Sequence, residues 1–290
     1  MTMHYRFLTQ QDLPSMLKTF EEAFVDYYVE ISFTEESFAT FLATNGVNYE
    51  LSVGAFDGKT MVGILLNAVD DWQGSCTAYD SGTGVIPDYR GQKIAGGMLK
   101  YAIPALQARG VKRYLLEVIQ ANEVGEQVYR KLGFEKIRTL DCLQGKVEDI
   151  KPYESKLGHP DIVIRDIEQP DWTTLQSLWQ WYPAWQNTSE TVIRTRHKNR
   201  ILGAYFQEIC LGYIIFYPDT GRIAQIAVAV QHQRQGIGTQ LLLACAERFT
   251  LSRTISMINI DGQAKATLAF LDHHGFMKTL SQYEMVLDLK

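Results

Sequence analysis

The stretch VIPDYRGQKIAGGML, residues 85–99, decides the architecture of this chain, because a second copy of its pattern occurs further on. The second copy is VAVQHQRQGIGTQLL, residues 228–242. Arg90 and Gln233, which hold the same place in the two copies, lie 143 residues apart. The pair Gly133-Phe134 recurs as Gly275-Phe276 at an offset of 142. Two signals at nearly the same offset indicate a tandem duplication of one domain.

Each copy runs from a β-rich apolar segment through a polar, glycine-containing loop into an apolar helical pattern. The start of a helix presents unpaired backbone N–H groups and the positive end of the helix dipole. Glycines in front of it let a phosphate approach that backbone. A short glycine-containing loop alone is weak evidence, because most such loops are tight turns. Its place between strand and helix, and its recurrence, favour a phosphate-binding loop.

Length and composition agree with two globular domains. The chain has 290 residues, 46% of them hydrophobic and 21% charged. Its net charge of −5 argues against a surface for nucleic acid. The four cysteines show neither metal-ligand nor redox spacing, so we expect free thiols and no bound metal. No apolar run is long enough for a membrane span and the N-terminus lacks a signal-peptide core, which favours the cytoplasm.

The first domain is predicted over residues 1–143. Residues Asp57-Gly58 separate two apolar strands and indicate a hairpin. We expect strands at 4–8, 51–56, 61–69, 76–86 and 113–119, and helices starting near Gln11 and at 35–42, 95–108 and 123–132.

Residues 144–160 are polar, contain glycine and proline, and are predicted to be a linker. The second domain, 161–290, then repeats the plan, with a strand at 162–165 and a helix opened by Pro170-Asp171. The fold class predicted for each copy is α+β: a twisted, mixed but mostly antiparallel sheet flanked by helices.

The repeated loop resembles the acyl-coenzyme A loop of the GNAT acetyltransferase superfamily, whose signature is Gln/Arg-x-x-Gly-x-Gly/Ala. Gln233, Gly236 and Gly238 match it in full, whereas in the first copy Lys93 stands where the first glycine is expected. The resemblance implies coenzyme A contacts from two sets of residues. They are Val85, Arg90, Gly91, Gln92, Lys93, Ile94, Ala95 and Gly96 in the first copy, and Val228, Gln233, Arg234, Gln235, Gly236, Ile237 and Gly238 in the second.

The first copy continues the resemblance with LEVIQAN, residues 116–122, and YRKLGF, residues 129–134. These strings are similar to those of acetyltransferases that act on protein N-terminal amines. The resemblance implies two tandem GNAT folds and an N-acetyltransferase that uses acetyl-coenzyme A as co-substrate. The acceptor would be a small-molecule or peptide amine that attacks the thioester directly.

Such a reaction has three chemical needs: a base for the amine, a donor to the thioester carbonyl, and an acid for the leaving thiolate. By resemblance, Glu117 is the candidate base, the backbone N–H near Val85 the donor, and Tyr129 the acid. Asn122 would hold the pantetheine arm or the start of its helix. Asp80 is the rival base, since Glu117 in a strand can equally be a solvated surface residue.

The second copy lacks these groups, because Leu271, Asn259 and Ala264 replace Tyr129, Glu117 and Asn122. Asp261, His273 and His274 are the possible substitutes. The better phosphate loop therefore lies in the half with the poorer chemistry. Three hypotheses follow: catalysis in the first domain, catalysis in the second, or a non-catalytic acyl-coenzyme A sensor.

Two aromatic segments are candidates for the acceptor side. Residues 24–33, FVDYYVEISF, combine aromatic and acidic side chains that suit a cationic group or pack a helix pair. Residues 179–187, WQWYPAWQN, suit either a domain interface or a second pocket. Tyr79 is a further candidate for the acceptor wall. The acceptor itself and the choice between monomer and homodimer stay open.

Overall fold

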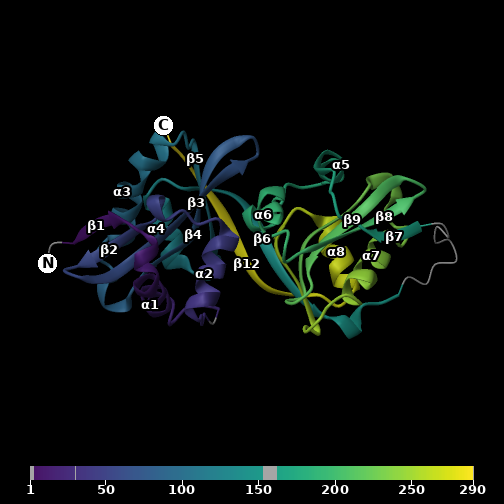
Figure 1. Ribbon diagram of the computed structural model, residues 1–290, viewed down its shortest axis with the longest axis horizontal. Helices are drawn as coiled ribbons and strands as arrows, with labels where there is room; N and C mark the ends of the chain where they lie inside the picture. The colour runs from purple at the N-terminus through teal and green to yellow at the C-terminus, as the bar shows by residue number, and fades with distance from the viewer. Residues whose placement is uncertain (1–2, 30, 153–161, 290) are drawn as a thin grey trace. The chain divides into compact units, whose positions relative to one another are not determined.

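The computed structural model describes residues 3–29, 31–152 and 162–289. The chain forms two compact units, one made of Met1–Ile137 with Glu284–Lys290 and the other of Arg138–Tyr283. In each unit helices flank a mixed sheet that is mostly antiparallel, which confirms the predicted fold class (Figure 1).

The sheet of the first unit has the order β1-β2-β3-β4-β5-β12. Its strands β1 to β4 are antiparallel neighbours, whereas β4 and β5 run parallel. The strands are β1 (His4–Phe7), β2 (Val53–Asp57), β3 (Thr60–Trp72), β4 (Ser75–Val85), β5 (Arg113–Ile119) and the end of β12 (Met277–Asp288). The helices are α1 (Leu13–Ala23), α2 (Glu35–Asn45), α3 (Ile94–Ala108) and α4 (Glu123–Lys131), with 3-10 turns η1 (Gln10–Asp12), η2 (Tyr49–Leu51) and η3 (Pro87–Tyr89).

The second unit repeats this order as β7-β8-β9-β10-β11-β6, with the start of β12 next to β6. The strands are β6 (Glu135–Lys146), β7 (Ile162–Asp166), β8 (Arg200–Phe206), β9 (Ile209–Tyr217), β10 (Arg222–Val228) and β11 (Thr254–Asp261). The helices are α5 (Trp172–Ser177), α6 (Ser189–Arg194), α7 (Ile237–Ala246) and α8 (Lys265–His273), with 3-10 turns η4 (Val147–Asp149), η5 (Trp185–Asn187) and η6 (Val230–His232).

The two copies exchange their last strands. The last strand of the first copy, β6, pairs with β11, and the last strand of the second copy, β12, reaches β5 (Figure 1). The expected boundary at 143 therefore falls inside a strand: residues 144–146 end β6 and 147–149 form η4, so this part of the predicted linker is wrong. Residues 153–161 of that prediction lie outside the described residues. We retain 1–143 and 161–290 as the proposed limits of the sequence repeat.

Most predicted elements are confirmed to within a few residues. The Asp57-Gly58 turn joins β2 to β3, with Gly58 at φ 59°, and the strand at 113–119 has the predicted bounds. The helix opened by Pro170-Asp171 is α5, whose N-terminal N–H groups are capped by the Asp171 carboxylate. Helix α6 was not predicted, because its six residues are too short to show a helical period.

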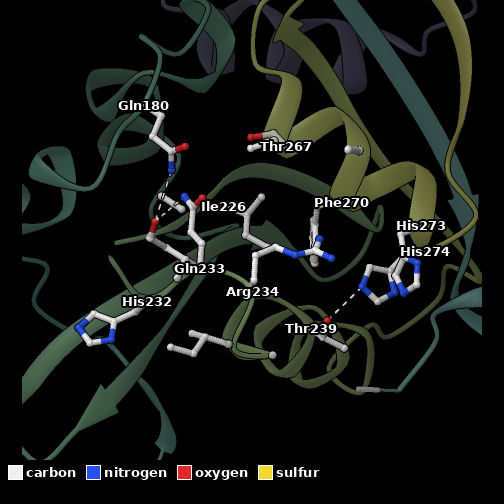
Figure 2. Close-up of a pocket in the computed structure, with 17 residues that line it drawn as sticks. Gln180, Ile226, His232, Gln233, Arg234, Thr239, Thr267, Phe270, His273 and His274 are labelled. Atoms are coloured by element: carbon white, nitrogen blue, oxygen red, sulfur yellow. Dashed lines mark hydrogen bonds between the residues drawn. The ribbon is translucent and has the colours of Figure 1, made fainter. Parts of the chain in front are cut away.

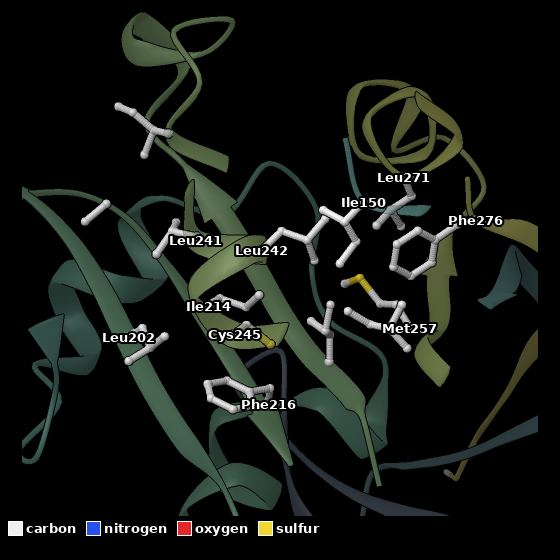
Figure 3. Close-up of a cluster of buried hydrophobic side chains, with 14 of the residues drawn as sticks. Ile150, Leu202, Ile214, Phe216, Leu241, Leu242, Cys245, Met257, Leu271 and Phe276 are labelled. Atoms are coloured by element: carbon white, nitrogen blue, oxygen red, sulfur yellow. The ribbon is translucent and has the colours of Figure 1, made fainter. Parts of the chain in front are cut away.

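Each unit has its own hydrophobic core. In the second unit, Leu241, Leu242 and Cys245 of α7 pack over Ile214 and Phe216 of β9 (Figure 3). In the first, α1 and α2 bury an aromatic cluster against β3 and so fix the helices around the sheet. None of the four cysteines, all of which lie in the described residues, forms a disulfide.

Candidate functional site

The candidate site of each unit begins where two parallel strands separate. β4 pairs with β5 only from Thr77 to Tyr79, and β10 pairs with β11 only at Arg222 and Ile223. A β-bulge follows at once in both strands, leaving one extra residue between Asp80 and Gly82 and one between Ile223 and Gln225. Bulges often lie beside active sites because they redirect side chains and end the pairing.

The ends of the separated strands carry backbone donors directed away from the sheet partner. The N–H of Ile86 donates to Val62 on β3, and the N–H of Ala229 donates to Leu211 on β9. Since successive N–H groups in a strand point to opposite edges, those of Val85 and Val228 face the gap between the strands. This orientation suits the carbonyl-polarising role predicted for Val85.

The second loop has the geometry of an anion site. Gly236 is the N-cap of α7 with φ 82°, and the first helical bond runs from Gln240 N–H to Gly236 O at 3.0 Å. The preceding N–H groups, those of Ile237 and Gly238 included, have no acceptor within the helix. The Gln233 side chain donates to Val228 O at 3.2 Å and thereby ties the loop to β10. Gln235 donates to Gln231 O at 3.3 Å, which braces the loop from within.

The first loop has left-handed backbone at the same two positions as the second loop, but its glycine stands at the other of the two positions. Gly91 has φ 76° where the second loop has Arg234 at φ 62°, and Lys93 has φ 61° where the second has Gly236. Each loop thus needs left-handed backbone at two positions and carries glycine at only one. The Lys93 and Gln92 side chains are exposed to solvent. A lysine at the position of the signature glycine therefore leaves the loop backbone accessible to a phosphate.

Arg90 supports the first loop through its side chain. Its guanidinium donates to both carboxylate oxygens of Asp26, at 2.6 and 2.7 Å, and to Val85 O at 3.1 Å. Gln233 makes the same contact to Val228, so the first signature residue has a common role of tying the loop to its strand.

The first turn of α3 packs closely against its neighbours. Ile94 is buried, and a Cβ at Gly96 would lie 3.1 Å from Leu132 after α4. Gly96 therefore allows α3 to approach the segment after α4. Ala95, between Ile94 and Gly96 in the sequence, is half-buried at the helix start.

A cavity of about 320 Å³ opens at the second loop (Figure 2). It lies between the end of β10, the start of α7 and one face of α8, with Gln180 closing a side by donating to Val228 O at 3.4 Å. Thr267, Phe270 and His273 line it from α8.

The two candidate histidines differ in their surroundings. His274 is buried; its Nδ1 accepts from the backbone N–H of Lys151 at 3.2 Å, and its Nε2 therefore donates to Thr239 Oγ1 at 3.1 Å. Burial lowers the His274 pKa to about 4, so the ring is neutral at physiological pH and ties α8 to α7. His273 lines the cavity and is the better candidate for a ligand contact.

The first unit brings the predicted acid and the rival base together. Tyr129 of α4 donates to Asp80 Oδ2 at 3.3 Å, and Thr83 donates to the same oxygen at 2.5 Å. Asp80 Oδ1 accepts from the backbone N–H of Gly82 at 2.9 Å, inside the bulge. Burial raises the Asp80 pKa to about 6 despite these bonds, and burial also raises the Tyr129 pKa well above 10. Thr83 was missed at the sequence level, since only the bulge brings it to Asp80.

Glu117 lies in a second polar cluster of the same unit. It is half-buried, and the buried Tyr79 hydroxyl donates to its carboxylate. Tyr79 is a candidate for the acceptor wall by sequence, but in the structure it is buried and its hydroxyl holds Glu117. Asn122 caps α4 by accepting from Gly125 N–H at 3.0 Å, which favours the helix-start role over the pantetheine role.

The second unit has no counterpart of these clusters at the equivalent positions. Ile223 and Leu271 are buried hydrophobic residues at the places of Asp80 and Tyr129. Ala264 is the N-cap of α8 without a side-chain bond, and Asp261 forms an ion pair with Arg138 at 3.2 Å. Ile223 and Leu271 therefore cannot transfer a proton as Asp80 and Tyr129 can, whereas His232 and His273 line the cavity of this unit.

The aromatic segments form walls within their own units. In the first, the Tyr28 hydroxyl donates to Ala121 O at 2.7 Å and joins the loop after α1 to the end of β5. In the second, Trp179 donates to Tyr213, which donates to Gln225, each at 2.6 Å. These three line a small cavity of about 20 Å³, which has room for about one water molecule.

The chain belongs to the acetyltransferase (GNAT) family, whose sequence profile matches residues 14–134 and 163–276. N-alpha-acetyltransferase 30 from Schizosaccharomyces pombe is 27% identical over 92 residues, which cover 31% of this chain and 61% of that protein. The chain thus spans under two thirds of the curated relative.

Solved structures show the same fold over the whole chain. A tandem GNAT protein from the clavulanic acid biosynthesis pathway superposes with a TM-score of 0.73 at 13% identity, covering 100% of this chain and 99% of that one. A GCN5-related N-acetyltransferase from Sphaerobacter thermophilus also gives 0.73, at 12% identity and 99% and 96% coverage. The tandem GNAT architecture predicted from the repeat is confirmed.

Two features are absent from the described residues. Between residues 3 and 289, leaving out 30 and 153–161, no helix has the length and hydrophobicity needed to cross a bilayer. The same residues contain no group of three His, Cys, Asp or Glu side chains placed to hold a metal ion.

The raised pKa of Asp80 predicts a pH-dependent stability effect. Because the folded state binds this proton more tightly than the unfolded chain, the stabilisation is complete below pH 3.8 and is lost as pH rises through about 6. Asp80→Asn should therefore raise the free energy of unfolding by about 2 kcal/mol at pH 8, with the gain shrinking towards pH 4. Urea unfolding at both pH values measures it, and an equal change at both would contradict the buried-carboxylate account.

Proposed function

We propose that this protein is an acetyl-coenzyme A-dependent N-acetyltransferase whose first unit performs the transfer. The observation that carries the proposal is the Tyr129–Asp80–Thr83 cluster beside the separated ends of β4 and β5. The family uses acetyl-coenzyme A as a substrate, and the curated relative is named an N-alpha-acetyltransferase, which supports an amine acceptor.

In this mechanism the pyrophosphate binds at the start of α3, against the N–H groups from Gly91 to Ala95. The thioester carbonyl lies at the Val85 N–H, which stabilises the negative charge that develops on the oxygen. The neutral amine attacks the carbonyl carbon, the C–S bond breaks, and Tyr129 gives its proton to the leaving thiolate. The proton that the acylated nitrogen loses then restores the Tyr129 hydroxyl. Asp80, hydrogen-bonded to Tyr129, holds that hydroxyl in place and stabilises its orientation.

The acceptor enters from the side of the loop after α1. Asp26 and Tyr28 of this loop contact the coenzyme loop and the end of β5, through Arg90 and Ala121 respectively. The aromatic and acidic side chains here suit an ammonium-bearing small molecule or peptide N-terminus.

A second candidate function belongs to the second unit: binding of an acyl-coenzyme A without transfer. The open cavity at a complete signature loop favours it, together with the hydrophobic residues Ile223 and Leu271 where the first unit has acid and phenol. For the whole chain, a purely sensing role without turnover is the alternative to an enzyme.

Removing the Tyr129 hydroxyl should separate catalysis from binding. Tyr129→Phe should lower kcat on the order of 10²-fold, because the thiolate loses its proton donor, while KM for acetyl-coenzyme A changes little. The measurement is release of free thiol from acetyl-coenzyme A with a panel of amines and short peptides. Tyr101→Phe, an exposed tyrosine of α3, is the control. Normal turnover by Tyr129→Phe would rule out the proposed acid.

Calorimetric titration of acetyl-coenzyme A assigns the sites. Ala95→Glu and Gly238→Glu place a carboxylate at the same point of the first turn of α3 and α7, without requiring left-handed backbone. We expect two sites in the wild type and the loss of one in each variant, through repulsion of the phosphates.

The matched Ala95→Gln and Gly238→Gln variants keep the size and remove the charge, which controls for the close approach of Phe270 to Gly238. A single wild-type site, lost only in Gly238→Glu, would move catalysis to the second unit.

A further inference from the structure

The exchanged strand β12 brings a buried carboxyl group of the second copy into the first unit. Leu289 N–H donates to Lys112 O at 2.8 Å, and Arg113 Nε lies 3.6 Å from Asp288 Oδ1, so β12 runs antiparallel to β5. Continued four residues along each strand, this register places Glu117 opposite Glu284. Side chains at such opposed positions share one face of the sheet and lie within contact distance.

The surroundings of this pair disfavour two negative charges. The Glu284 side chain is 0% exposed and Glu117 is half-buried. Tyr79 of β4 faces the pair and donates to Glu117. The Tyr79 pKa is raised well above 10, first by burial and then by Glu117, Asp80 and Glu284, which places both carboxyl groups near one hydroxyl. Two buried carboxylates that face each other hold one proton between them.

The second unit shows the same juxtaposition with neutral residues. There Cys142 of β6 and Asn259 of β11 hold the equivalent positions, and Cys142 Sγ lies 3.3 Å from Asn259 Oδ1. Strand exchange therefore brings these two positions into contact in both units, and the first unit alone has acids there.

We propose that Glu284 is a positioning residue of the first unit's site, holding one proton jointly with Glu117 so that the pair's remaining negative charge takes the proton that the acceptor amine loses. The inference rests on the proposed transferase function. The ammonium group gives one proton to the pair, and the free amine forms the C–N bond as the C–S bond breaks. The thiolate receives its proton from Tyr129, and the second proton that the nitrogen loses restores the Tyr129 hydroxyl. The second copy thus completes the first unit's site.

Infrared difference spectroscopy of the full chain tests the shared proton without any acceptor. At pH 8 Asp80 is ionised, so the wild type should show one protonated carboxyl stretch from the pair. Glu284→Gln should lose that band, because Glu117 then ionises alone, and Glu284→Asp should keep it. Glu123→Gln, an exposed residue of α4, is the control. Absence of the band in the wild type, or its persistence in Glu284→Gln, overturns the proposal. Thermal unfolding checks that each variant folds.

The pH profile of transfer tests the role in the reaction. Glu284→Gln should move the acidic limb of kcat/KM up by about one pH unit, because the Glu117 carboxylate loses the shared proton that stabilises its charge, with KM for acetyl-coenzyme A unchanged. Cys142→Ser, the equivalent position of the second unit, should leave the limb in place. An unmoved limb in Glu284→Gln refutes the positioning role. If no amine in the panel is acetylated, the proposed function fails, while the infrared result still decides the shared proton.

Discussion

The separation of two parallel strands after a short run of pairing is the constraint on which the rest of the structure depends. It releases β4 from β5 beyond Tyr79, and the bulge that follows turns Asp80 and Thr83 towards each other. It also leaves the Val85 N–H without a sheet partner on that edge. A backbone donor, a buried acid and a phenol therefore meet in one gap, although they come from separate segments of the chain.

The two units share this strand separation and the loop backbone that follows it, but they carry different residues at the equivalent positions. Their loops require the same two left-handed positions, yet one has Gly91 and Lys93 and the other Arg234 and Gly236. Left-handed backbone in a non-glycine residue costs on the order of 1 kcal/mol, and each loop contains one such residue. The signature glycine is thus one of two solutions to the same backbone demand, and its absence at Lys93 does not by itself disable the first loop.

Sequence reasoning located most of what is local. The Asp57-Gly58 hairpin and the helix after each loop follow from short-range pattern and spacing, whereas the choice of Tyr129 follows from the family resemblance of its sequence string. It failed where contacts are long-range. The linker prediction assumed that each copy closes on itself, but β6 and β12 carry the same strand pattern whichever sheet they join. Nothing in that pattern tells which partner a strand will have, so the facing of Glu117 and Glu284 could not be predicted.

Strand exchange also changes how a duplicated domain can diverge. If each copy were self-contained, one could lose its chemistry without affecting the other. Here residues 142 and 259 meet in the second unit, and the register of β5 with β12 places residues 117 and 284 opposite each other in the first, so each pair joins one position from each copy. A buried charge introduced on either β12 or β6 must be matched by its partner in the other copy, because an unmatched buried charge is strongly destabilising. Under the proposed function, the second copy is therefore constrained by the site of the first, although its own equivalent positions hold Leu271 and Ile223.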